Sequence, residues 1–345
     1  MGTNAEAVQF HPCIVVGAGL AGITFARAWT EAGKGALLLE RSFKPGGRIA
    51  TRHFQGQPID YGPAFLHGSH PDFVALLQSL EPGRSLDQWP NQTLGNGRPC
   101  EPRAMREGEY RVALAAGLNE LPATLALGLD IQTRVRVTSV EVGADQVRVN
   151  TDDGAYDTDH LIICTAVPQA LKLMGDQWDH LVGGNTVQFL LEQTHHDACL
   201  TVILALSEGA VLPDWDMVFP EDGGLQTIIV DSRKRGTGAI PVLVAQATPH
   251  WSAARIDQDP ALWGGQLARM CLDYCALSEE HVIWRHPHRW TWARADSAFT
   301  LTEPIILSTP GKAKIGLAGD VFWSSPGAEA AFLSGRRLAE RLLEQ

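Results

Sequence analysis

The stretch Cys13-Ile14-Val15-Val16-Gly17-Ala18-Gly19-Leu20-Ala21-Gly22 decides the fold of this 345-residue chain. Its four leading apolar residues predict a short buried strand, and the residues from there to Gly33 have the pattern of a helix. At the junction stands Gly17-x-Gly19-x-x-Gly22. The first glycine permits a tight turn, the second lets the backbone approach a pyrophosphate, and the third lets helix and strand pack closely. A pyrophosphate here would meet free N–H groups and the positive end of the helix dipole.

A second apolar strand, Ala36-Leu37-Leu38-Leu39, ends at Glu40, eighteen residues beyond Gly22. A carboxylate at this position can accept hydrogen bonds from ribose hydroxyls, and it would repel a 2′-phosphate, which argues against NADP. The strand–helix–strand unit therefore predicts a Rossmann domain for NAD or FAD. A glycine-rich packing turn that binds nothing is the structural alternative.

The bulk composition excludes several other classes of protein. The chain has 39 acidic and 28 basic side chains, a formal charge of -11, and no dense run of Lys or Arg, so we expect no nucleic-acid partner. Its apolar runs are far shorter than the ~20 residues of a membrane span. The six cysteines, Cys100 among them, form no C-x-x-C pair, and no Lys or Arg precedes His11. We therefore expect reduced thiols, no secretory signal and a cytoplasmic location.

The residues after Glu40 distinguish FAD from NAD. Arg41, Gly46-Gly47-Arg48 and Ile59-Asp60-Tyr61-Gly62 form an arrangement that resembles the flavin-containing amine oxidase superfamily. In that superfamily the glycine pair brings the backbone against the cofactor, and the arginine meets the diphosphate. This role suits a guanidinium, whose forked N–H groups match phosphate oxygens. A surface turn with a solvated arginine is the alternative interpretation of these residues.

The C-terminal region resembles the closing motif of the same superfamily. Gly316-Leu317-Ala318-Gly319-Asp320 is similar to the segment whose acidic residue binds the ribityl or diphosphate region, and Pro326-Gly327-Ala328 would open a helix toward the flavin. A helix dipole there would stabilise negative charge. The resemblance implies non-covalent FAD, since no Cys follows Cys275. Its expected contacts are Gly17, Gly19, Ala21, Gly22, Glu40, Arg41, Gly46, Gly47, Arg48, Pro63, Ala64, Val137, Gly319, Asp320, Gly327, Ala328 and Ala331.

The expected fold class is α/β, with a Rossmann-type FAD-binding domain and a second, mixed or antiparallel-sheet substrate domain. Alternating strand patterns from Ile131 to Thr151 and the apolar run 161–164 predict a meander that returns to the nucleotide sheet. Long strands and a helix near 262–275 predict the second domain, and a strand and helix at the C-terminus complete the first. The expected boundaries are 8–70, 111–167 and 305–345 for the FAD-binding domain, and 71–110 and 168–304 for the substrate domain.

Within the superfamily, the chain resembles the renalase-like branch in four further segments. These are 117–121, 166–170, 225–234 and 288–293; Trp292 and Arg235-Gly236 depart from the usual tyrosine and proline. The resemblance implies an oxidase that takes a hydride from a dihydronicotinamide dinucleotide isomer and passes electrons to dioxygen, with no catalytic side chain assigned. Cationic and aromatic groups would bind this small-molecule substrate. The candidates are Arg233, Lys234, His288, Arg289, Trp290 and Trp292.

Two other functions remain open on the sequence. One is an amine oxidase that acts on a primary amine or polyamine, and the other is a dinucleotide-binding sensor without turnover. A disulfide reductase is disfavoured because the chain has one G-x-G-x-x-G and no C-x-x-C. His195-His196-Asp197 and His286-Pro287-His288 supply metal-ligand types without further ligands at a recognisable spacing, so we expect no metal. Cys271 and Cys275 could meet on one helix face, as a redox pair or as apolar surface.

Overall fold

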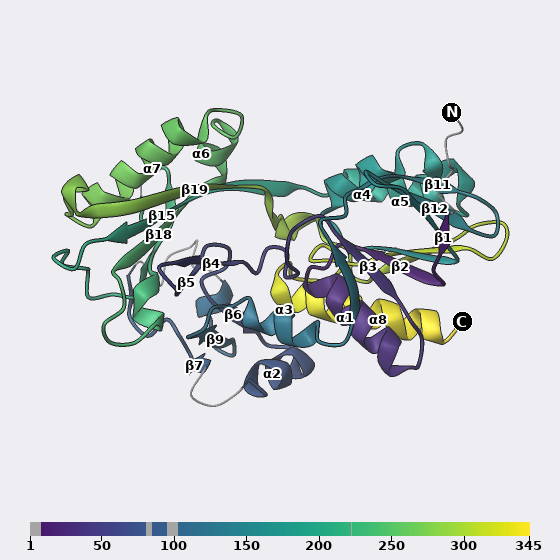
Figure 1. The fold of residues 1–345 in the computed structure, drawn as a ribbon, viewed down its shortest axis with the longest axis horizontal. Helices are drawn as coiled ribbons and strands as arrows, with labels where there is room; N and C mark the ends of the chain where they lie inside the picture. Colours follow the sequence, from purple (N-terminus) through teal and green to yellow (C-terminus); the bar gives the residue numbers. More distant parts are fainter. Residues whose placement is uncertain (1–7, 81–84, 95–102, 222) are drawn as a thin grey trace, which may run out of the picture. The chain divides into compact units, whose positions relative to one another are not determined.

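A computed structural model describes residues 8–80, 85–94, 103–221 and 223–345. Contacts between Cα atoms divide the chain into two compact units, each built from separate stretches of sequence (Figure 1). Unit 1 comprises Met1–Gly47, Pro122–His195 and Ala295–Gln345, and unit 2 comprises Arg48–Leu121 and His196–Arg294. The N- and C-terminal segments therefore share one unit, as the sequence predicts.

The described strands of unit 1 include a six-stranded sheet in the order β10-β3-β2-β14-β21-β20. All neighbours pair in parallel except β20 and β21, which are antiparallel. The central strand β2 is fully buried, as expected for a parallel strand covered on both faces. The strands are β2 (Cys13–Val16), β3 (Leu37–Glu40), β10 (Asp130–Thr133), β14 (His160–Ile163), β20 (Ile305–Ser308) and β21 (Lys314–Leu317).

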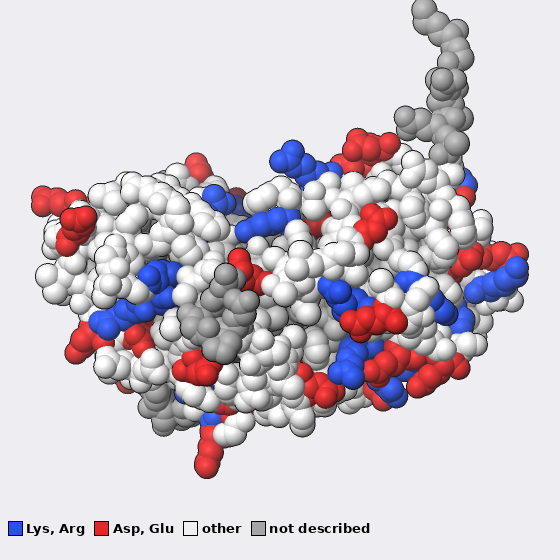
Figure 2. All heavy atoms as spheres, turned by 60° about the horizontal axis from the view of Figure 1, so that its bottom comes forward, with Lys and Arg blue, Asp and Glu red and all other residues white. Residues whose placement is uncertain are grey.

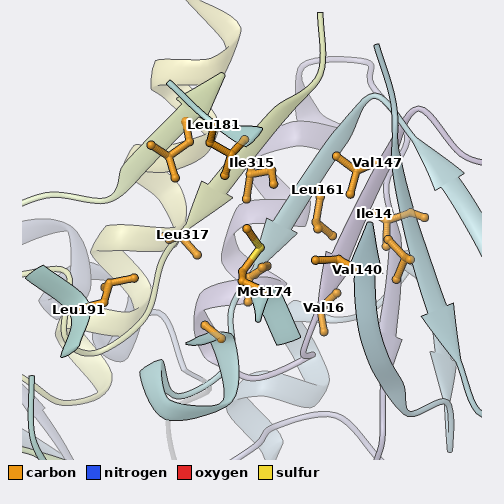
Figure 3. Packing of buried hydrophobic residues seen from close by; sticks show 14 of the residues in the cluster. Ile14, Val16, Val140, Val147, Leu161, Met174, Leu181, Leu191, Ile315 and Leu317 are labelled. Carbon is orange, nitrogen blue, oxygen red and sulfur yellow. The ribbon is translucent and has the colours of Figure 1, made fainter. Parts of the chain in front are cut away.

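Two helices, α1 (Leu20–Glu31) and α8 (Ala328–Leu343), pack against each other beside this sheet (Figure 1). Their approach is so close that a Cβ on Gly335 would lie 2.2 Å from the Ala21 carbonyl oxygen. On another side of the sheet, apolar residues of the strands meet residues of the surrounding helices (Figure 3). Ile14, Leu161 and Ile315 there pack with Met174 and Leu181.

A second sheet of unit 1 has the order β1-β13-β12-β11 among the described residues. The meander predicted from the sequence is therefore only partly in the nucleotide sheet. β10 and β14 join that sheet, whereas the strands between them form the second sheet. Val140 and Val149 of the second sheet are buried in the core that it shares with the nucleotide sheet. The remaining elements of unit 1 are β1 (Gln9–Phe10), β11 (Val137–Val142), β12 (Val147–Thr151), β13 (Ala155–Thr158), α4 (Val167–Met174), η2 (Gln177–His180), α5 (Gly184–Glu192) and η5 (Ser297–Phe299); α3 (Glu120–Leu125) spans the division between the units.

Unit 2 contains, among its described residues, a six-stranded sheet in the order β19-β15-β18-β17-β16-β8. β15, β18, β17 and β16 pair antiparallel, and β8 is parallel to β16. Both faces are covered, which explains the continuous apolar run of β15. Its strands are β8 (Thr93–Leu94), β15 (His196–Leu206), β16 (Met217–Val218), β17 (Leu225–Val230), β18 (Val242–Ala247) and β19 (Val282–Ala295), the last of which ends in unit 1.

Alternate residues of β15 face the two layers that cover the sheet. Val202 and Leu204 pack with Trp263 of α7, whereas Ile203 and Ala205 pack with Ile59 of β5. Figure 1 shows α6 and α7 along one face of the sheet and the β4–β5 hairpin on the other. The remaining elements are β4 (Thr51–Phe54), β5 (Gln57–Asp60), β6 (Leu66–Gly68), α2 (Pro71–Gln78), β7 (Ser85–Asp87), η1 (Arg103–Met105), β9 (Tyr110–Leu114), η3 (Asp231–Lys234), α6 (Pro249–Ala253), α7 (Pro260–Tyr274) and η4 (Glu279–His281).

The bounds of the two units differ from the domain boundaries expected from the sequence. The β4–β5 hairpin belongs to unit 2 rather than to the nucleotide domain, because its Ile59 packs on the second sheet. Residues 168–195 belong to unit 1, because Met174, Trp178 and Leu191 complete the core of the first sheet. The fold class itself is as expected: a Rossmann-like domain joined to a second domain with a mostly antiparallel sheet.

The surface carries charges of both signs. On the face seen in Figure 2, Lys and Arg side chains alternate with Asp and Glu. Within the described ranges, no helix has the length and apolar character that a membrane crossing requires. Five cysteines are free thiols there, and Cys100 lies outside the described residues.

Candidate dinucleotide and substrate sites

The turn at residues 17–22, here called the glycine turn, has the geometry that its sequence predicts. Gly17 has φ +98°, a conformation that favours glycine, and its N–H donates to the Leu39 carbonyl at 2.9 Å. A Cβ on Gly22 would lie 2.0 Å from the Gly17 oxygen, so helix α1 could not pack so closely with any larger residue. A Cβ on Gly19 would meet no atom within 4 Å, so this backbone is open to a ligand.

Glu40 is fixed beside the glycine turn by backbone donors. Its side chain is nearly buried, and its two oxygens accept from the N–H groups of Ala18 at 2.9 Å and Ser42 at 2.8 Å. These bonds hold the carboxylate at the end of β3, where the ribose partner of a dinucleotide is expected. Each carboxylate oxygen can accept more than one hydrogen bond, so ribose hydroxyls can still be bound.

The glycine pair that follows β3 lies against the glycine turn. The Gly46 N–H donates to the Ala18 carbonyl at 2.8 Å, and Gly46 forms a parallel bridge with Gly19. Gly47 has φ +57°, and a Cβ there would lie 3.2 Å from the Gly19 Cα. Two motifs that are twenty-seven residues apart, counted from Gly19 to Gly46, thus form one backbone surface.

The C-terminal motif also lies in unit 1. The Ser334 hydroxyl, on α8, accepts from the Gly319 N–H at 3.1 Å and donates to the Gly319 carbonyl at 2.9 Å, which ties this loop to the helix. Asp320 beside it is nearly buried. The 16-residue helix α8 begins after Gly327, which has φ +147° and provides no side-chain cap. Its first turn therefore presents backbone N–H groups and a positive dipole end to an anionic group.

The other expected cofactor residues lie in both units. In unit 1, Arg41 is exposed just after β3, Val137 begins β11, and Ala21, Ala328 and Ala331 belong to α1 and α8. In unit 2, the Arg48 guanidinium donates to the Ala293 carbonyl at 3.3 Å, and Pro63 and Ala64 follow β5. The residues of unit 1 fit FAD. The open backbone at Gly19 suits the diphosphate, Glu40 can accept from a ribose, and the N-terminus of α8 suits a group with negative charge.

Two alanine substitutions should separate folding from cofactor binding at the glycine turn. Gly22→Ala forces a methyl group against the Gly17 carbonyl, and we expect a loss of about 1–3 kcal/mol in unfolding free energy, typical of overpacking. Gly19→Ala meets open space, so the fold should keep its stability while FAD binding weakens. Urea unfolding and FAD titration of both variants check this. Unchanged FAD affinity in Gly19→Ala would contradict the proposed approach of the pyrophosphate.

In unit 2, the segment 61–64 is held by three side chains of the second sheet and of η3. Trp290 Nε1 donates to the Tyr61 carbonyl at 3.1 Å, Gln246 Nε2 to the Gly62 carbonyl at 2.6 Å, and Lys234 Nζ to the Ala64 carbonyl at 2.9 Å. The expected cofactor residues Pro63 and Ala64 thus stand on a backbone whose carbonyls have fixed partners. Such support limits the movement of whatever the segment contacts.

Lys234 is part of a buried ionic cluster that we define as Asp60, Asp231, Lys234 and Arg235. Lys234 Nζ lies 2.7 Å from Asp60 Oδ2 and 2.6 Å from Asp231 Oδ1, and the Arg235 guanidinium contacts the same two carboxylates at 2.8 and 2.9 Å. The side chains of both aspartates and of Lys234 are wholly buried. Lys234 was expected to bind substrate phosphate; instead, its charge is paired inside unit 2.

One face of β19 carries four rings, here called the ring ladder: Trp284, His286, His288 and Trp290. Successive ring centroids lie 5.6, 6.5 and 4.3 Å apart. The rings share a face because side chains of a strand alternate with a period of two. Tyr61 lies against His288 and Trp290 at 4.8 and 5.4 Å, and Phe54 stacks on Trp284 at 4.8 Å.

The structure joins only some of the expected substrate residues. His288 and Trp290 meet in the ring ladder, and alternation places Trp292 on the same side of the strand. Arg289 is on the opposite side and donates to the Gln258 carbonyl at 3.0 Å. Arg233 donates to the Pro213 carbonyl at 2.5 Å and lies 3.9 Å from Asp216. Neither arginine accompanies the ladder.

Sequence reasoning missed Arg52, which the β4–β5 hairpin brings to the ring ladder. Its guanidinium carbon lies 5.9 Å from the centre of the Tyr61 ring. The signal was available, because Arg52 and Phe54 alternate with Thr51 and His53 along a predictable hairpin. Within the described ranges, no group of three or more His, Cys, Asp or Glu is arranged to hold a metal ion.

Comparison with known proteins identifies two matching family models. A model of an NAD(P)-binding Rossmann-like domain matches residues 15–80, and a model of flavin-containing amine oxidoreductases matches residues 101–235. Nicotine dehydrogenase of Pseudomonas putida is 43% identical over 68 residues, which are 20% of this chain and 14% of that protein. Rice polyamine oxidase 5 is 46% identical over 55 residues, 16% of this chain and 11% of that protein. The similarity to these relatives thus covers a small part of their length.

Solved structures share the fold over nearly the whole chain. The structure of a putative protoporphyrinogen oxidase from Exiguobacterium superposes with a TM-score of 0.71 at 14% identity, covering 99% of this chain and 100% of that one. Putrescine oxidase bound to putrescine has a TM-score of 0.71 at 12% identity, covering 98% and 100%. The solved structures thus show the fold that the chain adopts, and the family models show that its residues 15–80 and 101–235 are similar to Rossmann-like domains and to flavin-containing amine oxidoreductases.

Proposed function

We propose that the protein is an FAD-dependent oxidoreductase that oxidises a dihydronicotinamide dinucleotide isomer with dioxygen as the electron acceptor. The observation that supports FAD as the cofactor is the backbone surface formed by Gly19, Gly46 and Gly47 beside Glu40. The resemblance to the renalase-like branch and the ring ladder support the substrate. Planar rings favour a ligand with a planar ring, and both stacked and edge-on contacts stabilise it.

The residues of unit 1 would hold FAD by its polar half. The glycine turn would place backbone N–H groups at the diphosphate, and Glu40 would accept from a ribose. The first turn of α8, after Gly327, would stabilise negative charge on the ring system. FAD, when bound, supplies the two-electron redox chemistry that no protein side chain provides.

The chain needs no side-chain base for this reaction. A dihydronicotinamide ring becomes aromatic when it is oxidised, so its own electrons drive the bond cleavage. Burial, His286 and Arg52 lower the pKa of His288 to about 4, so its imidazole is neutral at pH 7. It would act there as a hydrogen-bonding and stacking surface rather than as a proton donor.

An amine oxidase is the second candidate function, and the names of the matched relatives favour it. Nicotine dehydrogenase, polyamine oxidase and putrescine oxidase are all named for amine substrates. This candidate predicts a carboxylate or another acceptor for the substrate ammonium. A sensor without turnover, the third possibility, has no specific observation in its favour.

One anaerobic experiment distinguishes these functions. The purified protein should be yellow and should release intact FAD on heating or acidification, because no Cys follows Cys275. Mixing with 2- and 6-dihydronicotinamide isomers should bleach the flavin within a stopped-flow trace, and air should restore the colour. Bleaching by putrescine or nicotine alone would replace the substrate proposal by the amine oxidase. A colourless protein that takes up no added FAD would refute the cofactor proposal.

A further inference from the structure

The ring ladder meets the positive charge of Arg52, which forms no ion pair with the other residues that the structure describes. Arg52 extends from β4 toward the face of β19 that carries the ladder, and its Nε is buried without a hydrogen-bond partner among the described residues. Within the ladder, His286 Nε2 is also buried and has no hydrogen-bond partner among the described residues. A buried polar atom without a partner is costly, so each such atom requires an explanation, such as a bound water, an ion or a functional role.

The electrostatic environment of the ladder is positive. Burial is the main cause of three pKa shifts near Arg52: it raises the pKa of Tyr61 and lowers the pKa values of His286 and His288. The charge of Arg52 partly offsets the shift of Tyr61 and adds to the shifts of both histidines. Besides burial, the groups that shift the pKa of these residues are Arg52 and, for His288, also His286. The acidic residues Asp60 and Asp231 of this unit are already paired with Lys234 and Arg235.

We propose that Arg52 and the ring ladder form a specificity-determining surface that binds a planar heteroaromatic ring bearing an anionic group, and that Arg52 disfavours substrates with an ammonium group. The rings supply stacking area, and the guanidinium supplies two-point recognition of a carboxylate or phosphate. An ammonium here would meet a like charge in a partly dehydrated place, where repulsion is stronger than in water. The inference rests on the proposed function, because it assigns a substrate class to the oxidase.

The test uses ligands that share a ring and differ in charge. Nicotinate, nicotinamide and 3-(aminomethyl)pyridine carry an anionic, a neutral and a cationic group on the same pyridine. Binding to the oxidised holoenzyme is followed by quenching of tryptophan fluorescence and by shifts in the flavin spectrum. We expect nicotinate to bind at least tenfold more tightly than 3-(aminomethyl)pyridine. Nicotinamide mononucleotide, compared with nicotinamide riboside, tests whether a phosphate rather than a ring carboxylate is the anion.

Variants of two arginines supply the matched controls. R52Q should remove the preference for the anionic member of each pair by about tenfold and leave nicotinamide binding unchanged, and R52K should retain part of it. R289Q, which changes a guanidinium on the opposite side of β19, should keep the wild-type preference. Wild-type protein that prefers neither anion, or an R52Q variant that retains the preference, would overturn the proposal.

The outcome is separable from that of the proposed function. Ligand binding measured by tryptophan fluorescence does not require flavin reduction, and reduction by dihydronicotinamide isomers does not require Arg52 to select an anion. If the isomers fail to bleach the flavin while nicotinate still binds through Arg52, the oxidase proposal fails and the surface remains. If bleaching occurs with no charge preference, only the role of Arg52 is refuted.

Discussion

Replacing Lys234 by methionine should lower the unfolding free energy by about 3–5 kcal/mol, which is typical of breaking a buried ion pair by removing one partner. The variant leaves Asp60 and Asp231 buried with Arg235 as their remaining charged partner, and the Ala64 carbonyl loses its donor. Methionine fills similar volume, so the loss reports on charge rather than on a cavity. Urea unfolding followed by circular dichroism measures the change.

The neighbouring residue provides the control for this prediction. Arg233 is in the same short helix η3, but its side chain is 36% exposed and lies 3.9 Å from Asp216. Arg233→Met should therefore cost no more than about 1 kcal/mol, as exposed ion pairs do. A loss of similar size in both variants would show that η3 tolerates no substitution, and that the buried charge of Lys234 has no special role.

The same cluster should set the acid stability of unit 2. Burial raises the pKa of Asp60, but the charges of Lys234 and Arg235 and hydrogen bonds from Lys234 and Thr51 outweigh it and hold the pKa below 3.8. A carboxyl with a lowered folded-state pKa adds stability above its unfolded pKa and loses it as the pH falls. Wild-type stability should therefore decline below about pH 4, and more steeply than in Lys234→Met.

The fold was predictable because its signals are local. The glycine turn needs six residues, and the strands that join it are short apolar runs, so α1, β2 and β3 lie where the sequence places them. The expected domain boundaries differ from the observed units for a physical reason. The β4–β5 hairpin and helices α4 and α5 are amphipathic, and sequence alone does not say which of two apolar sheets each one covers.

The expected cofactor residues were easier to predict than the expected substrate residues, because the cofactor residues lie closer together in the sequence. Gly17, Glu40 and Gly46 follow one another along one strand–helix–strand unit, so their meeting could be inferred. The contact between Asp60 and Lys234 joins positions 174 residues apart, and no spacing rule reaches that far. The sequence does predict that Arg289 and His288 lie on opposite faces, because successive side chains of a strand point to opposite sides of the sheet.

Replacing Arg48 by alanine should weaken FAD binding by a factor of about 10 to 150, equivalent to the ~1.5–3 kcal/mol of a charge-assisted hydrogen bond. Arg48 directly follows Gly47, the glycine whose backbone lies against the glycine turn. In the flavin-containing amine oxidase superfamily, which the chain resembles, the arginine after this glycine pair is the one expected at the diphosphate. Titration of apoprotein with FAD, followed by flavin fluorescence, gives the dissociation constant.

Arg255→Ala is the matched control, because it removes a guanidinium of unit 2 that has its own protein partners. Arg255 lies 4.3 Å from the centre of the Trp251 ring and donates to Gln266 Oε1 at 3.2 Å. Its loss should cost about 0.5–1 kcal/mol of local stability and leave FAD affinity unchanged. Equal FAD affinities in the two variants would show that Arg48 serves its contact with the Ala293 carbonyl rather than the cofactor, and that the diphosphate depends on backbone N–H groups alone.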